Sequence, residues 1–315
     1  MILIVSPPDN PHVDKVASLL KRPFVVFDNG WFPASSSLIA TFNREAERLL
    51  LTLPDGSAVD LAEVGAVWHR RISAMALDPE LRDETAKLFA WSESNEAQLG
   101  LWYSLHCYWM NPPPADEISQ RKLRQLQLAR SLELPIPETL ITNDPQAARA
   151  FIEESAPHEV VRKAFRNIVQ APRETSIVTE ADMALIDTVR FAPVIFQRFV
   201  PAELDLRVTI VDDEIFATAI RSSPARRADY RLGVGEAEVF PYDLPDDIGE
   251  KLLALMQAFD LRYGGIDLRV TPEGEHVFLE VNPAGEYLFV SERTGQPIPQ
   301  AIAAALDRHD LERLN

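Results

Sequence analysis

Apolar runs of strand length and segments with helical spacing alternate at the start of the chain. Residues 1–5 form a short apolar run, residues 11–20 have helical spacing, and residues 24–28 form a second apolar run. A strand, a helix and a second strand in this order predict the opening of a parallel βαβ unit. A later apolar run over residues 64–68 predicts a further strand. We therefore expect an α/β domain at the N-terminus.

Three consecutive prolines at residues 112–114 interrupt this pattern and mark the main domain boundary. A helix is expected to follow, over about residues 115–132. We predict three parts: an N-terminal α/β domain over residues 1–112, a central subdomain over 113–198 and a C-terminal subdomain over 199–315.

A β-hairpin is predicted near the C-terminus, where two apolar runs, residues 266–270 and 277–281, flank the turn sequence Thr-Pro-Glu-Gly-Glu. If Glu273 and Gly274 are the two central turn residues, cross-strand partners have numbers that sum to 547. The apolar residues are then expected to point together into a core: Ile266, Leu268, Val277, Leu279 and Val281.

The opposite face of this hairpin carries oxygen-bearing side chains. In the predicted register Asp267 faces Glu280, with Cβ atoms about 5 Å apart, and Asn282 shares the face of Glu280 because side chains alternate along a strand. Two carboxylates this close repel each other unless a cation lies between them. An all-oxygen ligand set is typical of Mg²⁺. The pattern therefore predicts a magnesium site, and the alternative is a solvent-facing hairpin whose acidic residues bind nothing.

Composition limits the classes of partner. The chain has 315 residues and a formal net charge of −17, whereas nucleic acids and anionic membranes attract basic surfaces. We therefore expect neither nucleic acid nor a membrane as a partner. The single cysteine, Cys107, excludes an intramolecular disulfide and is typical of a reducing cytoplasm. No apolar run approaches the length of a bilayer span, so we predict a cytoplasmic protein.

The hairpin resembles a known superfamily. Asp267, Glu280 and Asn282, followed by proline, are similar to the magnesium ligands of the ATP-grasp superfamily, whose closing motif is an Asp followed by Glu-x-Asn-Pro. Residues 278–287 and 294–298 resemble the peptide-modifying branch, which includes microviridin-type maturases and is also called the graspetide synthetases. The resemblance implies an ATP-grasp fold of mixed α/β (α+β) class behind the N-terminal parallel βαβ domain.

A second element agrees with this branch. Trp-His-Arg-Arg at residues 68–71 resembles its Trp-Tyr-Arg-Arg element, with His69 in place of the tyrosine.

The resemblance also implies which residues hold ATP. Lys122 and Lys163 match the two nucleotide-binding lysines, and the end of the apolar run over residues 193–200 matches the adenine hinge. Many superfamily members cover the phosphates with a glycine-rich loop, but residues 165–171 contain no glycine. The expected nucleotide-binding residues are Lys122, Lys163, Gln197, Phe199, Val200 and Glu203, the last as an acceptor for a ribose hydroxyl.

Three arginines are the catalytic candidates that the resemblance implies: Arg207, Arg221 and Arg231. Arg207 is expected to face an acyl phosphate, and the alternative is a structural ion pair with Asp205. Arg221 and Arg231 lie in a basic segment, residues 221–233, that could hold the γ-phosphate or attract an acidic peptide. The alternative for that segment is a mobile surface loop.

The resemblance implies an ADP-forming ligase that uses ATP and Mg²⁺. It would activate Glu or Asp side chains of a ribosomal precursor peptide, a leader followed by a Thr- and Glu-rich core, and join them to Ser, Thr or Lys side chains as omega-ester or omega-amide rings. A homodimer is expected. The alternatives are a glutathione-synthetase-like ligase for amino acids or small molecules, and a catalytically silent nucleotide- or peptide-binding module.

Overall fold

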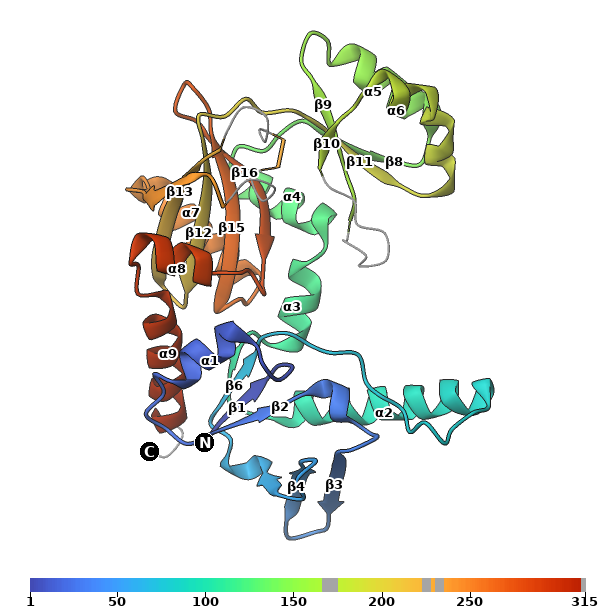
Figure 1. Ribbon diagram of the computed structural model, residues 1–315, viewed down its shortest axis with the longest axis vertical. Coiled ribbons are helices and arrows are strands. Elements are labelled where there is room, and N and C mark those ends of the chain that lie inside the picture. The colour runs from blue at the N-terminus through green and yellow to red at the C-terminus, as the bar shows by residue number, and fades with distance from the viewer. Residues whose placement is uncertain (166–174, 223–227, 230–234, 313–315) are drawn as a thin grey trace.

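The computed structural model describes residues 1–165, 175–222, 228–229 and 235–312, and Figure 1 shows a mixed α/β chain in which an N-terminal domain lies below two further sheets. The predicted mixed α/β class is confirmed. Within these residues, no helix combines the length and the apolar character needed to cross a bilayer.

The N-terminal domain is built on a parallel sheet. Its strands are β1 (Ile2–Val5), β2 (Phe24–Phe27), β6 (Ala66–His69) and β7 (Tyr108–Met110), in the order β2-β1-β6-β7. Helix α1 (Pro11–Ala17) connects β1 to β2, so the predicted βαβ opening is confirmed. The other elements of this domain are β3 (Ser37–Phe42), β4 (Glu47–Thr52) and β5 (Ala58–Asp60) in a small antiparallel sheet, two 3-10 helices (Asn29–Trp31 and Leu61–Glu63) and the long helix α2 (Glu84–Ser104).

Two helices replace the single helix predicted over residues 115–132. Helix α3 (Pro113–Ser119) ends before Gln120, and α4 (Lys122–Ser131) begins two residues later. The Gln125 side chain spans the break, where its Nε2 donates to the Ser119 carbonyl at 2.5 Å and to the Val281 carbonyl at 2.8 Å. The break makes Lys122 the first residue of α4.

The central sheet is antiparallel and small. Its strands are β8 (Thr139–Thr142), β9 (Val160–Lys163), β10 (Ser176–Ile177) and β11 (Val194–Arg198), in the order β10-β9-β11-β8. Helices α5 (Pro145–Glu154) and α6 (Glu180–Ala184) and a 3-10 helix (Ile186–Phe191) accompany it. A separate core of Ala148, Val160, Ile186, Val189 and Phe196 joins these elements.

The largest sheet is antiparallel and has the order β14-β13-β12-β15-β16. Its strands are β12 (Leu204–Val211), β13 (Glu214–Arg221), β14 (Glu238–Pro241), β15 (Tyr263–Val270) and β16 (His276–Asn282). Helices α7 (Asp246–Ala258) and α4 pack on one face of this sheet through a shared apolar core, which contains Leu252 and Leu128. The opposite face carries the charged residues described below.

The C-terminal helices connect this sheet to the N-terminal domain. Helix α8 (Leu288–Thr294) follows β16, and α9 (Ile298–Glu312) runs down to lie beside α1 in Figure 1. One apolar core contains Ile2, Val13 and Trp68 of the N-terminal domain together with Ile302 and Leu306 of α9. The predicted domain limits at residues 112 and 198 stay predictions.

The β15–β16 hairpin has the predicted Asp267–Glu280 pair but a different turn. The loop is centred on residues 272–274, with Gly274 at a φ of +85°, and a bulge follows between Asp267 and Leu268. Leu268 therefore pairs with Phe278, and Phe278 fills the core in place of Leu279. The predictions that Val277 and Leu279 point into this core are wrong, because the three-residue loop places Val277 opposite Arg269 and Leu279 is the extra residue of the bulge.

Candidate active site

Two buried ion pairs cross the charged face of the large sheet. Arg207 donates from Nη1 to Asp267 Oδ1 at 2.8 Å, and Arg269 donates from Nε to Asp205 Oδ1 at 3.0 Å. These side chains are between 6% and 8% exposed. The expected alternative, an Arg207–Asp205 pair, is wrong because the antiparallel register places Arg207 opposite Asp267.

The crossed pairs have a simple origin in the sequence. Asp-Leu-Arg-Val occurs twice, at residues 205–208 and 267–270. Antiparallel pairing of the two copies places each Asp opposite the Arg of the other copy, while both leucines face the core. Arg269 is absent from the predicted site residues, and this repeated tetrapeptide is the signal that identifies it.

The predicted metal ligands lie at the β16 edge of the same face. Glu280 is opposite Asp267, and Lys122 at the start of α4 forms an ion pair with Glu280. Asn282 ends the strand, where its Oδ1 accepts a hydrogen bond from the Ala284 N–H at 3.0 Å. Two carboxylates and an amide oxygen are hard donors of the kind Mg²⁺ prefers, so these residues fit the predicted ion.

A narrow pocket lies between the central sheet and the charged face. The predicted nucleotide residues Lys163, Gln197, Phe199 and Val200 line it, together with Leu279 and Arg269. The Lys163 ammonium donates to Gln197 Oε1 at 2.6 Å, and Gln197 donates in turn to Thr139 Oγ1 at 2.9 Å. Gln197 therefore holds Lys163 in position.

Arg269 also holds the predicted adenine hinge. Its Nη1 donates to the Val200 carbonyl at 2.8 Å, and its guanidinium carbon lies 5.0 Å from the centre of the Phe199 ring. The Phe199 N–H is already used by the Glu159 carbonyl at 2.8 Å. Arg269 thus fixes both residues of the hinge from the charged face.

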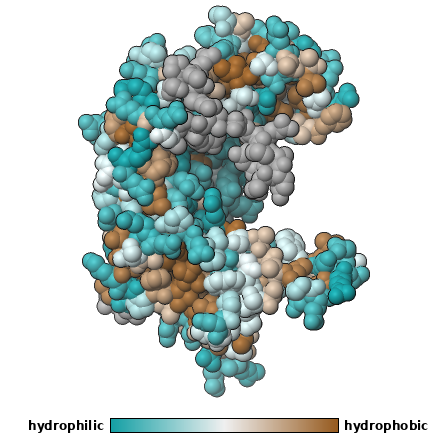
Figure 2. All heavy atoms as spheres, in the orientation of Figure 1, coloured by the Kyte–Doolittle hydropathy of each residue, from teal (hydrophilic) through white to brown (hydrophobic). Residues whose placement is uncertain are grey.

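A larger cavity of about 520 Å³ lies at the C-terminal end of β6. His69, Arg70 and Arg71 line one side, while Lys122 and Asn282 line another. Figure 2 shows the molecule hollowed on one side, between the N-terminal domain and the central sheet. Open α/β sheets often bind ligands at the carboxyl ends of their parallel strands.

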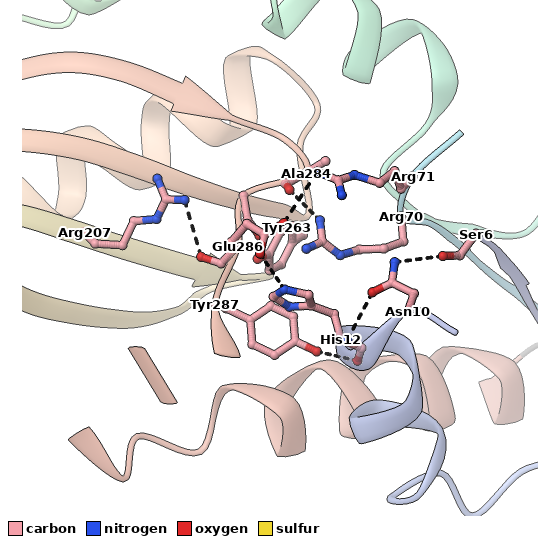
Figure 3. Close-up of polar contacts among 11 residues, drawn as sticks. Ser6, Asn10, His12, Arg70, Arg71, Arg207, Tyr263, Ala284, Glu286 and Tyr287 are labelled. Carbon is pink, nitrogen blue, oxygen red and sulfur yellow. Dashed lines mark hydrogen bonds and ion pairs between the residues drawn. The ribbon is translucent and has the colours of Figure 1, made fainter. Parts of the chain in front are cut away.

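A polar cluster joins the N-terminal domain to the loop after β16 (Figure 3). His12 Nε2 lies 2.9 Å from Glu286 Oε2, and Arg70 donates to the Ala284 carbonyl at 2.5 Å. Burial and the charge of Arg70 lower the pKa of His12. Burial alone would raise the pKa of Glu286, but the hydrogen bond from His12 and the two guanidinium groups lower it. A carboxylate can only accept, so neutral His12 donates from Nε2 to ionised Glu286.

Three predicted site residues lie elsewhere. Glu203 is exposed and does not line the pocket that contains Val200. Arg221 forms an exposed ion pair with Glu238 at 2.5 Å, and strand alternation places it on the face opposite Arg207. Arg231 lies outside the described residues, as does most of the glycine-free segment over residues 165–171.

His12 and Glu286 are also absent from the predicted site residues. They lie far apart in the sequence, and only the packing of α1 against the loop after β16 brings them together. No local spacing could have identified this pair.

Two family models match successive parts of the chain. Residues 1–117 match the family described as the MvdD pre-ATP grasp domain, and residues 119–306 match the RimK-like ATP-grasp domain. A search of curated proteins found no match.

Several solved structures are similar over nearly the whole chain. Macrocyclase MdnC from Microcystis aeruginosa MRC, bound with precursor peptide MdnA, is 32% identical with a TM-score of 0.86, covering 98% of this chain and 99% of that one. Macrocyclase MdnB from the same organism is 31% identical with a TM-score of 0.82, covering 97% and 98%. A Chryseobacterium gregarium RiPP-associated ATP-grasp ligase, in complex with ADP and a leader and core peptide, is 27% identical with a TM-score of 0.87, covering 97% and 96%.

The class of protein is an ADP-forming ligase with an ATP-grasp fold. Within this class, the chain belongs to the RimK-like ATP-grasp family, in its peptide-modifying branch.

Proposed function

We propose that this ligase activates Glu or Asp side chains of a ribosomal precursor peptide and joins them to Ser, Thr or Lys side chains. The observation that carries the proposal is the cavity of about 520 Å³, which is lined by Arg71 at one side and by Lys122 and Asn282 at the other. An acidic side chain in this cavity would lie beside the predicted phosphate and metal residues. The relatives bound to peptides support the choice of a peptide substrate.

In the first step, formation of the acyl phosphate, different residues of the site would bind the phosphates and the metal ion. A substrate carboxylate oxygen attacks the γ-phosphorus of ATP, and the bond from that phosphorus to the β–γ bridging oxygen breaks, which releases ADP and leaves an acyl phosphate. Lys163 and Lys122 would bind the phosphates as point charges. Asp267, Glu280 and Asn282 would hold Mg²⁺, which neutralises charge on the transferred group when bound.

Arg207 would face the acyl phosphate, which forms in the first step and reacts in the second. Its side chain lies between Asp267 and the loop after β16. In the second step a hydroxyl or amine of the peptide attacks the acyl carbon, phosphate leaves, and the acceptor loses a proton. Each ring therefore costs the peptide one water. No protein nucleophile is needed, since positioning and charge stabilisation carry the reaction.

Mass spectrometry of a Thr- and Glu-rich peptide encoded beside this protein tests the proposal. Incubation with the protein, ATP and Mg²⁺ is expected to remove one water per ring, with matching release of ADP. Unchanged peptide together with ADP release that does not depend on peptide would instead favour a ligase for amino acids or small molecules. The predicted homodimer is a separate proposal that light scattering of the full chain checks.

A further inference from the structure

The cavity of about 520 Å³ has a basic lining although the whole chain carries a charge of −17. Arg70, Arg71 and Lys122 line it with one carboxylate, Asp116. His69 adds no charge at neutral pH, because burial lowers its pKa to about 4. A concave site lined mostly by one sign of charge concentrates ligands of the opposite sign. The cavity therefore suits an anionic group.

Two of the three cations already have strong partners. Lys122 pairs with Glu280. Arg70 is 3% exposed and donates to the Ala284 carbonyl, with its guanidinium carbon 5.8 Å and 5.9 Å from the ring centres of Tyr263 and Tyr287. Arg70 is therefore a support for the wall of the cavity.

Arg71 differs from both. Among the described residues, its side chain has one ion pair, to Glu286 at 3.5 Å, and the two side chains are 61% and 53% exposed. Exposed pairs of this kind contribute about 0–1 kcal/mol, so a ligand can replace Glu286 at small cost.

Both the side chain and the backbone of Glu286 are held by other residues. His12 holds its carboxylate at 2.9 Å, and Arg207 contacts its backbone carbonyl at 3.4 Å. Figure 3 shows Glu286 between these groups, with Arg70 and Arg71 reaching toward the same loop. An internal carboxylate is thus presented to Arg71 beside the cavity.

We propose that Arg71 receives the side-chain carboxylate of the peptide substrate, and that Glu286 occupies Arg71 until the peptide displaces it. This inference rests on the proposed function. A planar guanidinium matches a carboxylate with two parallel hydrogen bonds, and a neutral amide cannot make the same charge-assisted contact. Arg71 would therefore select Glu or Asp over Gln or Asn before any chemistry occurs.

Peptide binding in the presence of a non-hydrolysable ATP analogue and Mg²⁺ tests the anchor. The probes are the Thr- and Glu-rich precursor peptide and a version in which every core Glu is Gln. Wild-type protein is expected to bind the Gln version about tenfold more weakly, which corresponds to about 1.4 kcal/mol. Arg71→Gln is expected to bind both versions within about twofold, and Arg71→Lys should fall between because lysine is a point charge.

Arg121→Gln is the matched control. Arg121 lies next to two lining residues but pairs with Glu117 at 2.5 Å and does not line the cavity. This variant removes the same charge and should keep the wild-type discrimination. If Arg71→Gln still bound the Glu version of the peptide about tenfold more tightly than the Gln version, Arg71 would not be the anchor. Ring formation by wild-type protein would then still support the proposed function. A wild-type protein that neither binds nor modifies the peptide would remove the proposed function and the anchor together.

Glu286→Gln tests the second half of the proposal. The amide introduced by this substitution would keep an oxygen that accepts from His12, but it would no longer compete for Arg71. The variant is expected to bind the precursor peptide about twofold to fivefold more tightly than wild type. Equal or weaker binding would show that Glu286 does not occupy the peptide's position.

Discussion

The acidic residues on the charged face form ion pairs with Arg and Lys side chains. How much stability is lost when one of them is replaced depends on how deeply its pair is buried. Asp267 and Asp205 are in pairs less than 9% exposed, and removing one partner of such a pair costs about 3–5 kcal/mol. Glu280 is 29% exposed and its partner Lys122 is 23% exposed. Glu280 is therefore the metal-ligand candidate whose substitution best separates catalysis from folding.

Glu280→Gln is expected to unfold at nearly the wild-type temperature and to lose ADP formation by roughly 100-fold or more, because an amide is a weaker ligand for Mg²⁺ than a carboxylate. Steady-state ADP release and thermal unfolding measure the two effects. The control is Glu275→Gln, an exposed residue beside the turn. Wild-type turnover by Glu280→Gln would remove Glu280 from the metal site.

His69 gives a pH dependence of stability. Burial lowers its pKa from 6.5 to about 4, so between these values the unfolded chain binds a proton that the fold does not. Stability therefore falls as the pH drops from 6.5 to 4 and levels off below, by at most about 3 kcal/mol from this residue. Urea unfolding of wild type and His69→Gln at several pH values measures it. Equal losses in both proteins would show that His69 titrates normally.

At the scale of elements, the hairpin shows what the sequence could and could not predict. The assumed two-residue turn is wrong, because the loop is one residue longer and shifts the pairing next to it. The bulge between Asp267 and Leu268 reverses that shift, so the predicted Asp267–Glu280 pair is confirmed. Gly274 signalled a turn but not its length. The break between α3 and α4 had no local signal, and Gln125, which lies just after it, is held by contacts with the distant residue Val281. The roles assigned to the site residues stay predictions.

Arg269→Lys tests whether β15 supports the predicted adenine hinge at Phe199 and Val200. Lysine keeps the buried charge beside Asp205 but cannot also reach the Val200 carbonyl with a fork geometry. The KM for ATP is expected to rise about tenfold, with a smaller change in kcat. Arg262→Gln is the control, because Arg262 precedes the same strand and is 53% exposed. An unchanged KM for ATP in Arg269→Lys would show that the hinge is held without this contact.

At the scale of the whole molecule, the N-terminal domain depends on the end of the chain. Helix α9 shares an apolar core with β1, α1 and β6, and Arg308 and Tyr108 both hold Asp212 at 2.7 Å. Since β6 belongs to this core, the side of the cavity of about 520 Å³ formed by residues 69–71 is held in place by the C-terminal helix. The strand pattern predicted the parallel sheet of this domain, but not that a helix as distant in sequence as α9 (Ile298–Glu312) covers it.

A fragment of residues 1–112 is expected not to fold cooperatively, because its sheet would expose the apolar surface that α9 covers, which includes Ile2, Ile4 and Trp68. Thermal unfolding followed by circular dichroism compares the fragment with the full chain. A cooperative transition in the fragment would support residues 1–112 as an independent domain.

The most direct test of the central claim is chemical capture of the activated peptide. A precursor peptide whose Ser, Thr and Lys residues are replaced by Ala is incubated with the protein, ATP, Mg²⁺ and hydroxylamine, and the product is sequenced by mass spectrometry. The account predicts hydroxamates on Glu or Asp side chains and one ADP for each. ADP release without hydroxamate on the peptide would contradict it.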